Sequence, residues 1–353
     1  MTDRIGVGIV GAGPVVQAIH LPTLARLTNR FEVRVILDID ENVATDVADR
    51  VSARATTDFQ DLLDDPSVEV VAICTPAFLH AEQVIAALES NKRAVFCEKP
   101  LARTLAEAAR IADAVERTGV PLVVGAMHTF DPGWLAVGDV VEKLAATAHT
   151  VRSSIALPFN NRFEDWATEI VQRPPRPEGG TPDAEALASL MSLGVLELAI
   201  HDLPVVRRFL PDADEVTVSA AVGLEPFGYA ITAVAGDRMI ELFGLISAQW
   251  QPKWEFEAIS DDTMLHIEFT PSFVQAGSAV ATVTMGGVST TYGSYGHNGY
   301  EGEWRAIGDI VEGNLGLMPD IADLIDDLTF AIRLAEGAAD VVRSAALSAE
   351  ASA

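Results

Sequence analysis

The sequence predicts two domains, a doubly wound α/β domain followed by an α+β domain with a large, mainly antiparallel open sheet. Residues 5–127 alternate short β-branched runs with longer helical patterns, which is typical of a parallel sheet covered on both faces. Between residues 215 and 295, β-rich segments follow one another without intervening helices, which favours an antiparallel sheet. A chain of 353 residues is long enough for about two domains. We place them at residues 1–127 and 128–353, and the helices of the tail are able to pack back on the first domain.

The first domain is predicted to have five strands and four helices. Its strands are bounded by Gly, Asp or Pro, and its helices carry apolar residues at helical spacing. We expect strands at 5–10, 32–37, 69–74, 94–96 and 121–125, and helices around 15–27, 41–52, 79–90 and 105–118.

The second domain is predicted to combine helices with eight further strands. We expect a helix at 131–146, a strand at 150–157, a helical stretch at 184–210 interrupted at Pro204, and helices from 300 to 342. Pro and Gly make up six of the twelve residues from 172 to 183, which excludes regular structure there. The strands of the sheet are expected at 216–222, 230–235, 239–246, 254–259, 264–269, 279–284 and 289–292.

One face of this predicted sheet has nothing in the chain to cover it. A sheet packs one face on the helices of its own domain, and a second apolar face seeks a partner. The pattern therefore predicts self-association through the open face, as a homodimer or homotetramer.

The charge balance argues against some classes of partner and limits how a phosphate-bearing cofactor can be bound. The chain has 24 Lys plus Arg against 51 Asp plus Glu, a net charge of −27. Such a chain repels phosphate backbones and anionic lipid, so we expect neither nucleic acid nor membrane as a partner. A phosphate-bearing cofactor must then be held mainly by backbone N–H groups and helix dipoles.

The remaining compositional features indicate a cytoplasmic protein. Cys74 and Cys97 end apolar runs without partners at metal-ligand spacing, and we expect both to be reduced and buried. The first residues enter a strand pattern directly, without the charged, apolar and cleavage-site series of a signal peptide. The apolar run from 5 to 19 is broken by glycines and is too short to cross a bilayer.

Gly11-Ala12-Gly13 forms a candidate phosphate-binding turn between the first strand and the first helix. Gly11 permits the tight turn, and Gly13 lets the backbone approach a pyrophosphate at the helix N-terminus. Asp38, 25 residues after Gly13, ends the second strand, where a carboxylate accepts hydrogen bonds from an adenosine ribose and repels a 2′-phosphate. We therefore predict NAD rather than NADP. The residues expected at the cofactor are Gly11, Ala12, Gly13, Pro14, Val15, Val16, Asp38 and Ile39, with valine at 16 in place of a third glycine.

Glu98-Lys99-Pro100 is a second candidate site, at the end of the strand predicted at 94–96. Charged residues at the carboxyl end of a buried strand lie where open α/β sheets bind ligands. A solvated turn with a surface lysine is the alternative that the triplet alone leaves open.

Several motifs together give the chain a resemblance to the Gfo/Idh/MocA family of oxidoreductases. They span residues 7–201 in order, and Glu98-Lys99-Pro100 is the most specific of them. They are Gly11-Ala12-Gly13 with His20-Leu21-Pro22, the run from Val70 to Pro76 with His80, Glu98-Lys99-Pro100, and Glu197 with His201.

The resemblance implies a Rossmann-type pyridine-nucleotide dehydrogenase acting on a sugar, cyclitol or related polyhydroxy compound. It places Thr75, Pro76, His80 and Glu98 beside the cofactor. It makes Lys99 catalytic and His201 the acid/base, with Glu197 beside it. A cis Lys99-Pro100 peptide is also implied.

The helix that carries His201 departs from the family pattern. Glu197 replaces an aspartate, Ala199 a glycine and Pro204 a second aspartate, while Ala77 and Thr129 replace the family's usual Asn and Arg elsewhere. Glu197 and His201 are spaced to share one helical face, and Pro204 is expected to bend that helix just past His201.

These residues suit the oxidation of a secondary alcohol. His201 can take the hydroxyl proton near neutral pH, and the Lys99 cation can stabilise the developing alkoxide. A structural histidine is the alternative for His201. Two other functions stay open: a redox-neutral enzyme of the same family that processes glycosides, and a regulatory protein that senses NAD without catalysis.

Weaker candidates for substrate contact are aromatic, basic or amide residues outside these motifs. Packing is the alternative role for each. They are His128 in the linker, Arg162 and Trp166 in a predicted loop, and His297, Asn298 and Trp304 before or within the last helices. No cluster at metal-ligand spacing and no nucleophile motif is present in the sequence, so no metal is predicted.

Overall fold

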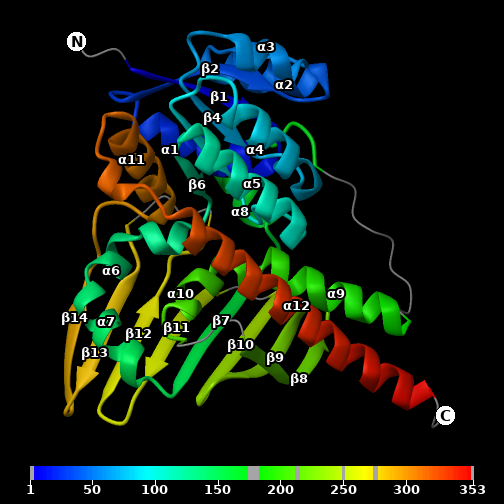
Figure 1. Cartoon of the computed structure of the whole chain (residues 1–353), viewed down its shortest axis with the longest axis vertical. Helices are drawn as coiled ribbons and strands as arrows, with labels where there is room; N and C mark the ends of the chain where they lie inside the picture. Colours follow the sequence, from blue (N-terminus) through cyan, green and yellow to red (C-terminus); the bar gives the residue numbers. More distant parts are fainter. Residues whose placement is uncertain (1–3, 174–182, 211–214, 249–250, 273–276, 351–353) are drawn as a thin grey trace. The chain divides into compact units, whose positions relative to one another are not determined.

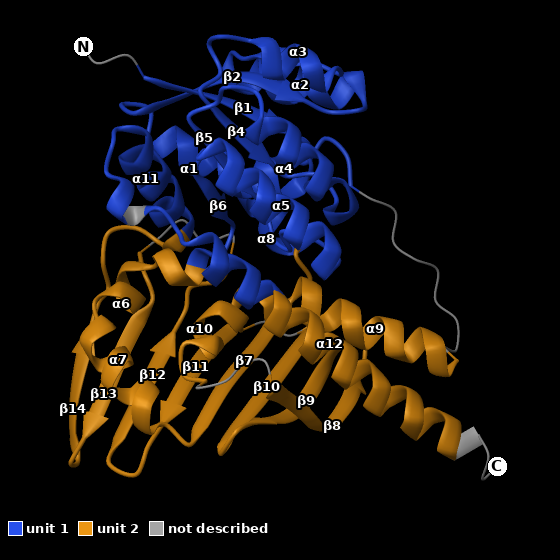
Figure 2. Ribbon diagram, viewed as in Figure 1, with its two compact units in different colours: residues 1–127, 161–175, 300–328 blue, residues 128–160, 176–299, 329–353 orange. Residues whose placement is uncertain are grey.

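The computed structural model describes residues 4–173, 183–210, 215–248, 251–272 and 277–350 (Figure 1). The chain forms two compact units (Figure 2). Unit 1 comprises residues 1–127, 161–175 and 300–328, and unit 2 comprises residues 128–160, 176–299 and 329–353. The division into folding domains at 1–127 and 128–353 stays a prediction.

Unit 1 is built on a six-stranded sheet in the order β3-β2-β1-β4-β5-β6, with every pair parallel. The predicted doubly wound parallel sheet is therefore confirmed. Strand order reverses at β1, which lies between β2 and β4, and the carboxyl ends there form the crevice where such sheets bind ligands. The strands are β1 (Ile5–Val10), β2 (Phe31–Leu37), β3 (Arg54–Thr56), β4 (Val70–Ile73), β5 (Ala94–Cys97) and β6 (Leu122–Val124).

The helices of unit 1 begin and end at the signals that the sequence carries. Asp40 caps α2 by accepting from the N–H groups of Asn42 and Val43, and Thr104 with Glu107 forms a reciprocal capping box on α5. The helices are η1 (Val16–His20), α1 (Leu21–Arg26), α2 (Glu41–Val51), α3 (Phe59–Asp64), η2 (Ala77–Leu79), α4 (His80–Leu88), α5 (Leu105–Thr118), α8 (Asn161–Ala167), α11 (Gly299–Val311) and η6 (Leu315–Leu317).

Unit 2 is built on an eight-stranded sheet in the order β14-β13-β12-β11-β7-β10-β9-β8. Only the central β7 and β10 pair in parallel, so the predicted mainly antiparallel sheet is confirmed. The strands are β7 (Thr150–Pro158), β8 (Val216–Leu224), β9 (Phe227–Ala235), β10 (Arg238–Ser247), β11 (Lys253–Ile259), β12 (Thr263–Glu268), β13 (Val280–Met285) and β14 (Val288–Tyr292).

The helices of unit 2 cover one face of this sheet (Figure 1). Burial alternates along β9, β10 and β11, as expected where only one face packs on helices. We call the opposite face the open face; it carries the exposed side chains of Val222, Val234, Met239 and Phe243. The helices are η3 (Met127–Phe130), α6 (Pro132–Leu135), α7 (Gly138–Thr147), α9 (Ala184–Glu197), η4 (Ala199–His201), α10 (Leu203–Arg207) and α12 (Ile321–Glu350), of which η3 and α12 continue from unit 1.

Two local predictions were wrong, and a third lies mostly outside the described residues. The helix expected at 131–146 is two helices, because the chain leaves helical geometry at Val137. The loop expected around Arg162 and Trp166 is the short helix α8, whose seven residues give too little periodicity to read. The Pro- and Gly-rich segment at 172–183 lies mostly outside the described residues.

The helical stretch predicted at 184–210 is interrupted earlier than Pro204. Helix α9 ends at Glu197, a single 3₁₀ turn follows, and α10 begins at Leu203 with Pro204 in its first turn. Proline lacks an N–H and fits the first turn, where that group has no partner within the helix. The proline therefore starts a new helix and does not bend an existing one.

One described segment, Ala184–His201, has the length and hydropathy of a membrane-spanning helix. Its mean hydropathy is 1.4, and 44% of it is buried. Within unit 2, Gly194 of α9 lies against the Tyr229 ring of β9, so this helix packs as core helices of water-soluble folds do. A single such segment is weak evidence for a membrane.

Candidate active site

The turn after β1 has the geometry that a phosphate-binding turn requires. Gly11 has φ +89°, and a Cβ there would lie 2.8 Å from the Cys74 carbonyl oxygen. Only glycine fits that position. A Cβ at Gly13 would meet no atom within 4 Å, so the backbone there is open to a ligand. Val16, in place of a third glycine, is fully buried and begins the π-helical turn η1.

Asp38 links the end of β2 to this turn. Its carboxylate accepts hydrogen bonds from the N–H groups of Ala12 at 2.8 Å and Asp40 at 3.0 Å. A carboxylate offers about four acceptor positions, so two remain for ribose hydroxyls.

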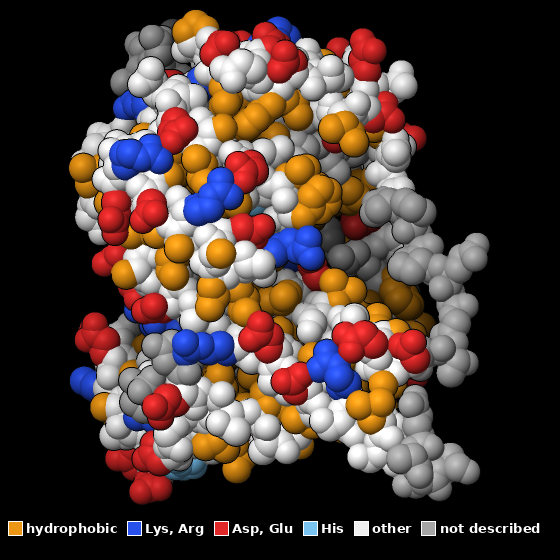
Figure 3. Space-filling model, turned by 45° about the vertical axis from the view of Figure 1, so that its right-hand side comes forward, with side chains coloured by type: hydrophobic (Ala, Val, Ile, Leu, Met, Phe, Trp, Pro, Cys, Tyr) orange, Lys and Arg blue, Asp and Glu red, His pale blue; other side chains and the backbone are white. Residues whose placement is uncertain are grey.

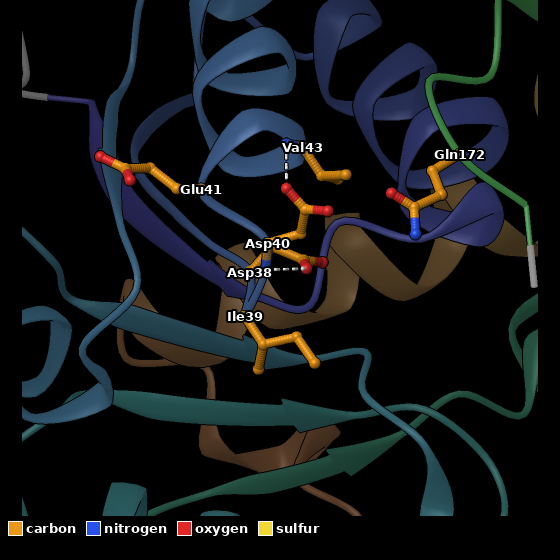
Figure 4. A pocket seen from close by; sticks show the side chains of 6 residues that line it. All are labelled: Asp38, Ile39, Asp40, Glu41, Val43 and Gln172. Atoms are coloured by element: carbon orange, nitrogen blue, oxygen red, sulfur yellow. Dashed lines mark hydrogen bonds between the residues drawn. The ribbon is translucent and has the colours of Figure 1, made fainter.

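A pocket of about 640 Å³ lies beside Asp38 (Figure 4). The side chain of Ile39, 92% exposed, projects from the strand end, and Gln172 lies across from Asp38 and Asp40. The residues that line the pocket are Asp38, Ile39, Asp40, Glu41, Val43 and Gln172.

His80 ties together the two turns that follow β4 and β5. Its Nε2 lies 2.7 Å from the Thr75 carbonyl oxygen and its Nδ1 lies 2.7 Å from the Pro100 carbonyl oxygen. Carbonyl oxygens only accept, so both bonds form at once when both ring nitrogens carry hydrogen. The Thr75-Pro76 and Glu98-Lys99-Pro100 turns are thereby held side by side.

The Glu98-Lys99-Pro100 turn lies at the carboxyl end of β5, and the Lys99-Pro100 peptide is cis, as the resemblance implied. Glu98 accepts from His20 Nε2 at 2.7 Å and from the Lys99 N–H at 3.1 Å. Burial by itself would raise the pKa of the Glu98 carboxyl. The hydrogen bond from His20 and the positive charge of Lys99 outweigh burial, so that pKa lies below its ordinary value.

In unit 2, His201 lies in the 3₁₀ turn after α9. The helix ends between Glu197 and His201, so the two side chains do not share one face of a continuous α-helix as expected. The His201 ring lies edge-on to the Trp254 ring, with centroids 5.5 Å apart. Glu197 is exposed.

Asp202, which was not among the predicted site residues, is the polar centre of this region. Its side chain is fully buried and accepts hydrogen bonds from His128 Nδ1 at 2.6 Å, Trp254 Nε1 at 2.9 Å and the Ser153 hydroxyl. Three donors satisfy a buried carboxylate. The sequence signal was an aspartate between apolar residues in a helical pattern, directly after His201.

His128 and Trp304, predicted as substrate residues, have packing contacts in this structure. The His128 ring is buried and stacks on Phe269 with centroids 3.7 Å apart. Trp304 is fully buried in unit 1, where it packs on Phe31 and Phe96. The contacts of Trp304 therefore indicate a role other than stacking on a sugar.

Of the other weak candidates, Asn298 is buried and the rest are more accessible. Trp166 on α8 is 69% exposed, with the Arg162 guanidinium over its ring at 5.8 Å. His297 is half-buried in unit 2, and Asn298 is buried there. Substrate contact by these residues stays a prediction.

Among the described residues, Glu255, His266 and Glu268 place ligand atoms within 4.8 Å of one another. They lie on β11 and β12, and Lys253 donates to Glu255 at 3.2 Å. An ammonium already bonded to one carboxylate competes with a cation, and we assign no metal to this group.

The comparisons with known proteins identify the family. Residues 5–126 match the family model described as "Oxidoreductase family, NAD-binding Rossmann fold". An inositol 2-dehydrogenase of Acidothermus cellulolyticus is 34% identical over 255 residues, covering 66% of this chain and 70% of the relative. The chain belongs to the Gfo/Idh/MocA family. The predicted NAD(P)-binding Rossmann fold is thereby confirmed.

Two further known proteins are similar to this chain, one in sequence and one in fold. An uncharacterized oxidoreductase of Bacillus subtilis, YrbE, is 30% identical over 224 residues, covering 63% of this chain and 58% of YrbE. KijD10, a 3-ketoreductase from Actinomadura kijaniata solved with NADP and TDP-benzene, superposes with a TM-score of 0.70 at 18% identity, covering 95% and 98% of the two chains. The chain spans a little over half the length of several curated relatives that it matches.

Proposed function

We propose that the protein is an NAD-dependent dehydrogenase that moves a hydride between the nicotinamide and a secondary alcohol of a sugar, cyclitol or related polyol. The observation that carries this proposal is the turn Glu98-Lys99 with cis Pro100, held by His80 beside the turn Thr75-Pro76 at the ligand-binding edge of the parallel sheet. The relatives named inositol 2-dehydrogenase support the class of substrate.

The residues present in unit 1 fit a dinucleotide. The open backbone at Gly13 suits the pyrophosphate, with Ala12, Pro14, Val15 and Val16 around it, and the free acceptor positions of Asp38 suit the adenosine ribose, with Ile39 beside it. Thr75, Pro76, His80 and Glu98 would hold the nicotinamide half. The nicotinamide, when bound, supplies the hydride acceptor or donor.

Asp38 favours NAD over NADP. Its carboxylate lies at the end of β2 and accepts from two backbone N–H groups, and among the described residues no cationic side chain pairs with it, so a 2′-phosphate there would face a negative charge. Family membership by itself leaves both cofactors open.

In the proposed reaction, His201 transfers the hydroxyl proton and Lys99 stabilises the charge on the substrate oxygen. In alcohol oxidation, the carbon loses a hydride, and the hydroxyl proton goes to a ring nitrogen of His201. The Lys99 ammonium stabilises the negative charge that develops on the substrate oxygen. Glu197, on the last turn of α9, is assigned to contact a substrate hydroxyl. The reverse reaction returns the proton from His201 as the ketone is reduced.

Replacing Lys99 with Met tests this assignment. Loss of the charged group should lower kcat by about 10²–10⁴-fold, because electrostatic and acid/base groups contribute that much. NADH binding, followed by fluorescence titration, should stay within a few-fold of wild type. Lys143→Met, at an exposed position of α7, is the matched control and should keep full activity. Full residual activity in Lys99→Met would exclude Lys99 from catalysis.

A panel of sugars, inositols, glycosides and sugar acids, each assayed with NAD and with NADP, tests the substrate class. Stoichiometric NADH from a polyol excludes a redox-neutral glycoside-processing enzyme of the family. NAD binding without hydride transfer to any member of the panel at high pH would instead favour a regulatory NAD sensor, the function that Glu197 and Pro204 leave open.

The proposal extends to assembly and location. We infer a homodimer or homotetramer formed through the open face, in the cytoplasm, with a small polyhydroxy molecule as the partner and neither nucleic acid nor membrane. The net charge of −27 supports the last two points. Figure 3 shows Asp and Glu side chains spread over the visible face, with fewer Lys and Arg between them.

A further inference from the structure

A chain of directed hydrogen bonds runs inside unit 1 from α11 to the Glu98-Lys99-Pro100 turn. Trp304 Nε1 lies 3.2 Å from His20 Nδ1, and His20 Nε2 lies 2.7 Å from Glu98 Oε1. The other oxygen of Glu98 accepts the Lys99 N–H. Both His20 and Trp304 are almost completely buried, packed against Phe96.

The direction of these hydrogen bonds determines which ring nitrogen of His20 carries hydrogen. An indole N–H only donates, so His20 Nδ1 must accept and carries no hydrogen. The hydrogen of the neutral ring then lies on Nε2, where it points at Glu98. A second proton on His20 would sit on Nδ1 and remove the acceptor for the Trp304 indole N–H. Two buried N–H groups would then point at each other.

A second carboxyl shares this interior. Glu303, next to Trp304 on α11, is fully buried, and neither of its oxygens has a hydrogen-bond partner among the described residues. Burial, followed by the charge of Glu98, raises its pKa well above the ordinary value. Of the two carboxyls, Glu98 has donors and a nearby ammonium, so Glu98 carries the charge and Glu303 carries a proton.

We propose that His20 and Trp304 are positioning residues that keep Glu98 ionised and aimed at Lys99, while Glu303 beside them stays a neutral acid. This rests on the proposed catalytic role of Lys99. The Glu98 anion and the Lys99 cation attract each other, and it is the positive charge of Lys99 that stabilises an alkoxide.

The groups that face Glu98 come from each element packed around it. They are His20 from η1, Lys99 and the Cys97 thiol from the β5 end, the Cys74 thiol from the β4 end and Glu303 from α11. Burial raises the pKa of both thiols, which keeps them neutral. Lys99 and His20 are therefore the two groups of the set that stabilise the Glu98 anion.

Histidine tautomers can be read directly from multiple-bond ¹H–¹⁵N spectra of protein labelled with ¹⁵N-histidine. We expect His20 to be the Nε2–H tautomer at pH 7, because Nδ1 accepts from Trp304 and Nε2 faces Glu98. In Trp304→Phe the donor to Nδ1 is lost, and His20 should no longer be held as a single tautomer. An imidazolium or an Nδ1–H tautomer in the wild type would overturn the proposal, whatever the activity of the protein.

Two amide variants of His20 separate positioning from packing. His20→Gln places an amide near the position of Nε2 and keeps a donor to Glu98, whereas His20→Asn places its amide near Nδ1 and loses that donor. Without a donor, burial should neutralise Glu98, and Lys99 should lose its proton at lower pH. The alkaline limb of the kcat profile should therefore shift down by about one pH unit or more in His20→Asn and stay near wild type in His20→Gln.

Equal alkaline limbs in the two amide variants would also overturn the proposal. NADH fluorescence titration and circular dichroism establish that each variant is folded and binds cofactor. If either variant fails to fold, the tautomer measurement on the wild type still decides the matter. An inactive wild type with the predicted tautomer would refute the dehydrogenase function alone.

Discussion

At the residue scale, two buried carboxylic acids in this protein are in opposite situations. Asp202 in unit 2 has three donors, so its charge is compensated. Glu303 in unit 1 has no hydrogen-bond partner among the described residues. An uncompensated carboxylate in an apolar interior would cost several kcal/mol, so Glu303 keeps its proton instead. Whether a buried carboxyl group is ionised therefore depends on its hydrogen-bond donors as well as on its burial.

Glu303→Gln should stabilise the protein near neutral pH. The unfolded chain ionises Glu303 above its ordinary pKa of 4.5, whereas the folded protein keeps the proton because its pKa is raised. The folded state thus binds one proton more, and wild-type stability falls as pH rises through this window. The advantage of Glu303→Gln should grow by about 1.4 kcal/mol per pH unit above pH 4.5 until the folded pKa is passed, and vanish below pH 4.5.

Thermal unfolding of both proteins at several pH values measures this difference. Glu116→Gln, at an exposed position on α5, is the matched control and should change stability by less than about 0.5 kcal/mol at every pH. A constant difference between Glu303→Gln and wild type from pH 4 to pH 8 would mean that Glu303 is ionised in the folded protein.

At the element scale, local signals determine where the helices of unit 1 begin. Helix α5 carries a complete capping box, in which Glu107 accepts the Thr104 N–H at 3.1 Å while the Thr104 hydroxyl accepts the Glu107 N–H at 3.2 Å. Helix α5 follows the Glu98-Lys99-Pro100 turn in the sequence. Its capping box therefore holds the backbone in place shortly after that turn.

Thr104→Ala should lower stability by about 1 kcal/mol, because it removes the cap of α5. For a unit of this size the melting temperature should fall by about 2–4 °C, as measured by calorimetry or circular dichroism. Thr147→Ala, at the exposed end of α7, should not destabilise the protein. An unchanged melting temperature in Thr104→Ala would show that the cap contributes nothing.

At the scale of the whole molecule, the open face of the eight-stranded sheet is the surface through which we propose that the protein associates. Val222, Val234, Met239 and Phe243 lie on adjacent strands of this face and are exposed in the single chain. Contiguous exposed apolar side chains are typical of surfaces that associate. The ion pairs of Arg152 with Glu241 and Glu257 lie on the same face and would contribute specificity more than affinity.

Phe243→Glu should convert the predicted homo-oligomer to a smaller species. A charge at the centre of an apolar interface remains buried and unpaired, which costs several kcal/mol of association free energy. Light scattering after size exclusion measures the mass. Leu135→Glu, at an exposed position of α6 on the helix-covered face of the sheet, should leave the mass unchanged. A wild-type protein that is already monomeric would contradict association through the open face.

Short-range signals were enough to predict much of this protein. The alternation of strands and helices predicted the parallel sheet, and consecutive β-rich segments predicted the antiparallel one, because both patterns depend on neighbours along the chain. The turn at Gly11 and the carboxylate at Asp38 were singled out in the same way, whereas the cis bond at Lys99-Pro100 was implied by the family resemblance. Strand β3 and helix α3 were missed, since three and six residues give too short a pattern.

Only the tertiary structure could show which residues far apart in the sequence are joined by hydrogen bonds and which buried groups lack a partner. The sequence by itself determined the fold class, the nucleotide-binding turn and the family. It could not show that Trp304 donates to His20, 284 positions away, that Glu303 is buried without a donor, or that Asp202 gathers His128, Ser153 and Trp254. The physical reason is that burial and hydrogen-bond direction arise from packing between elements, and no local pattern encodes them.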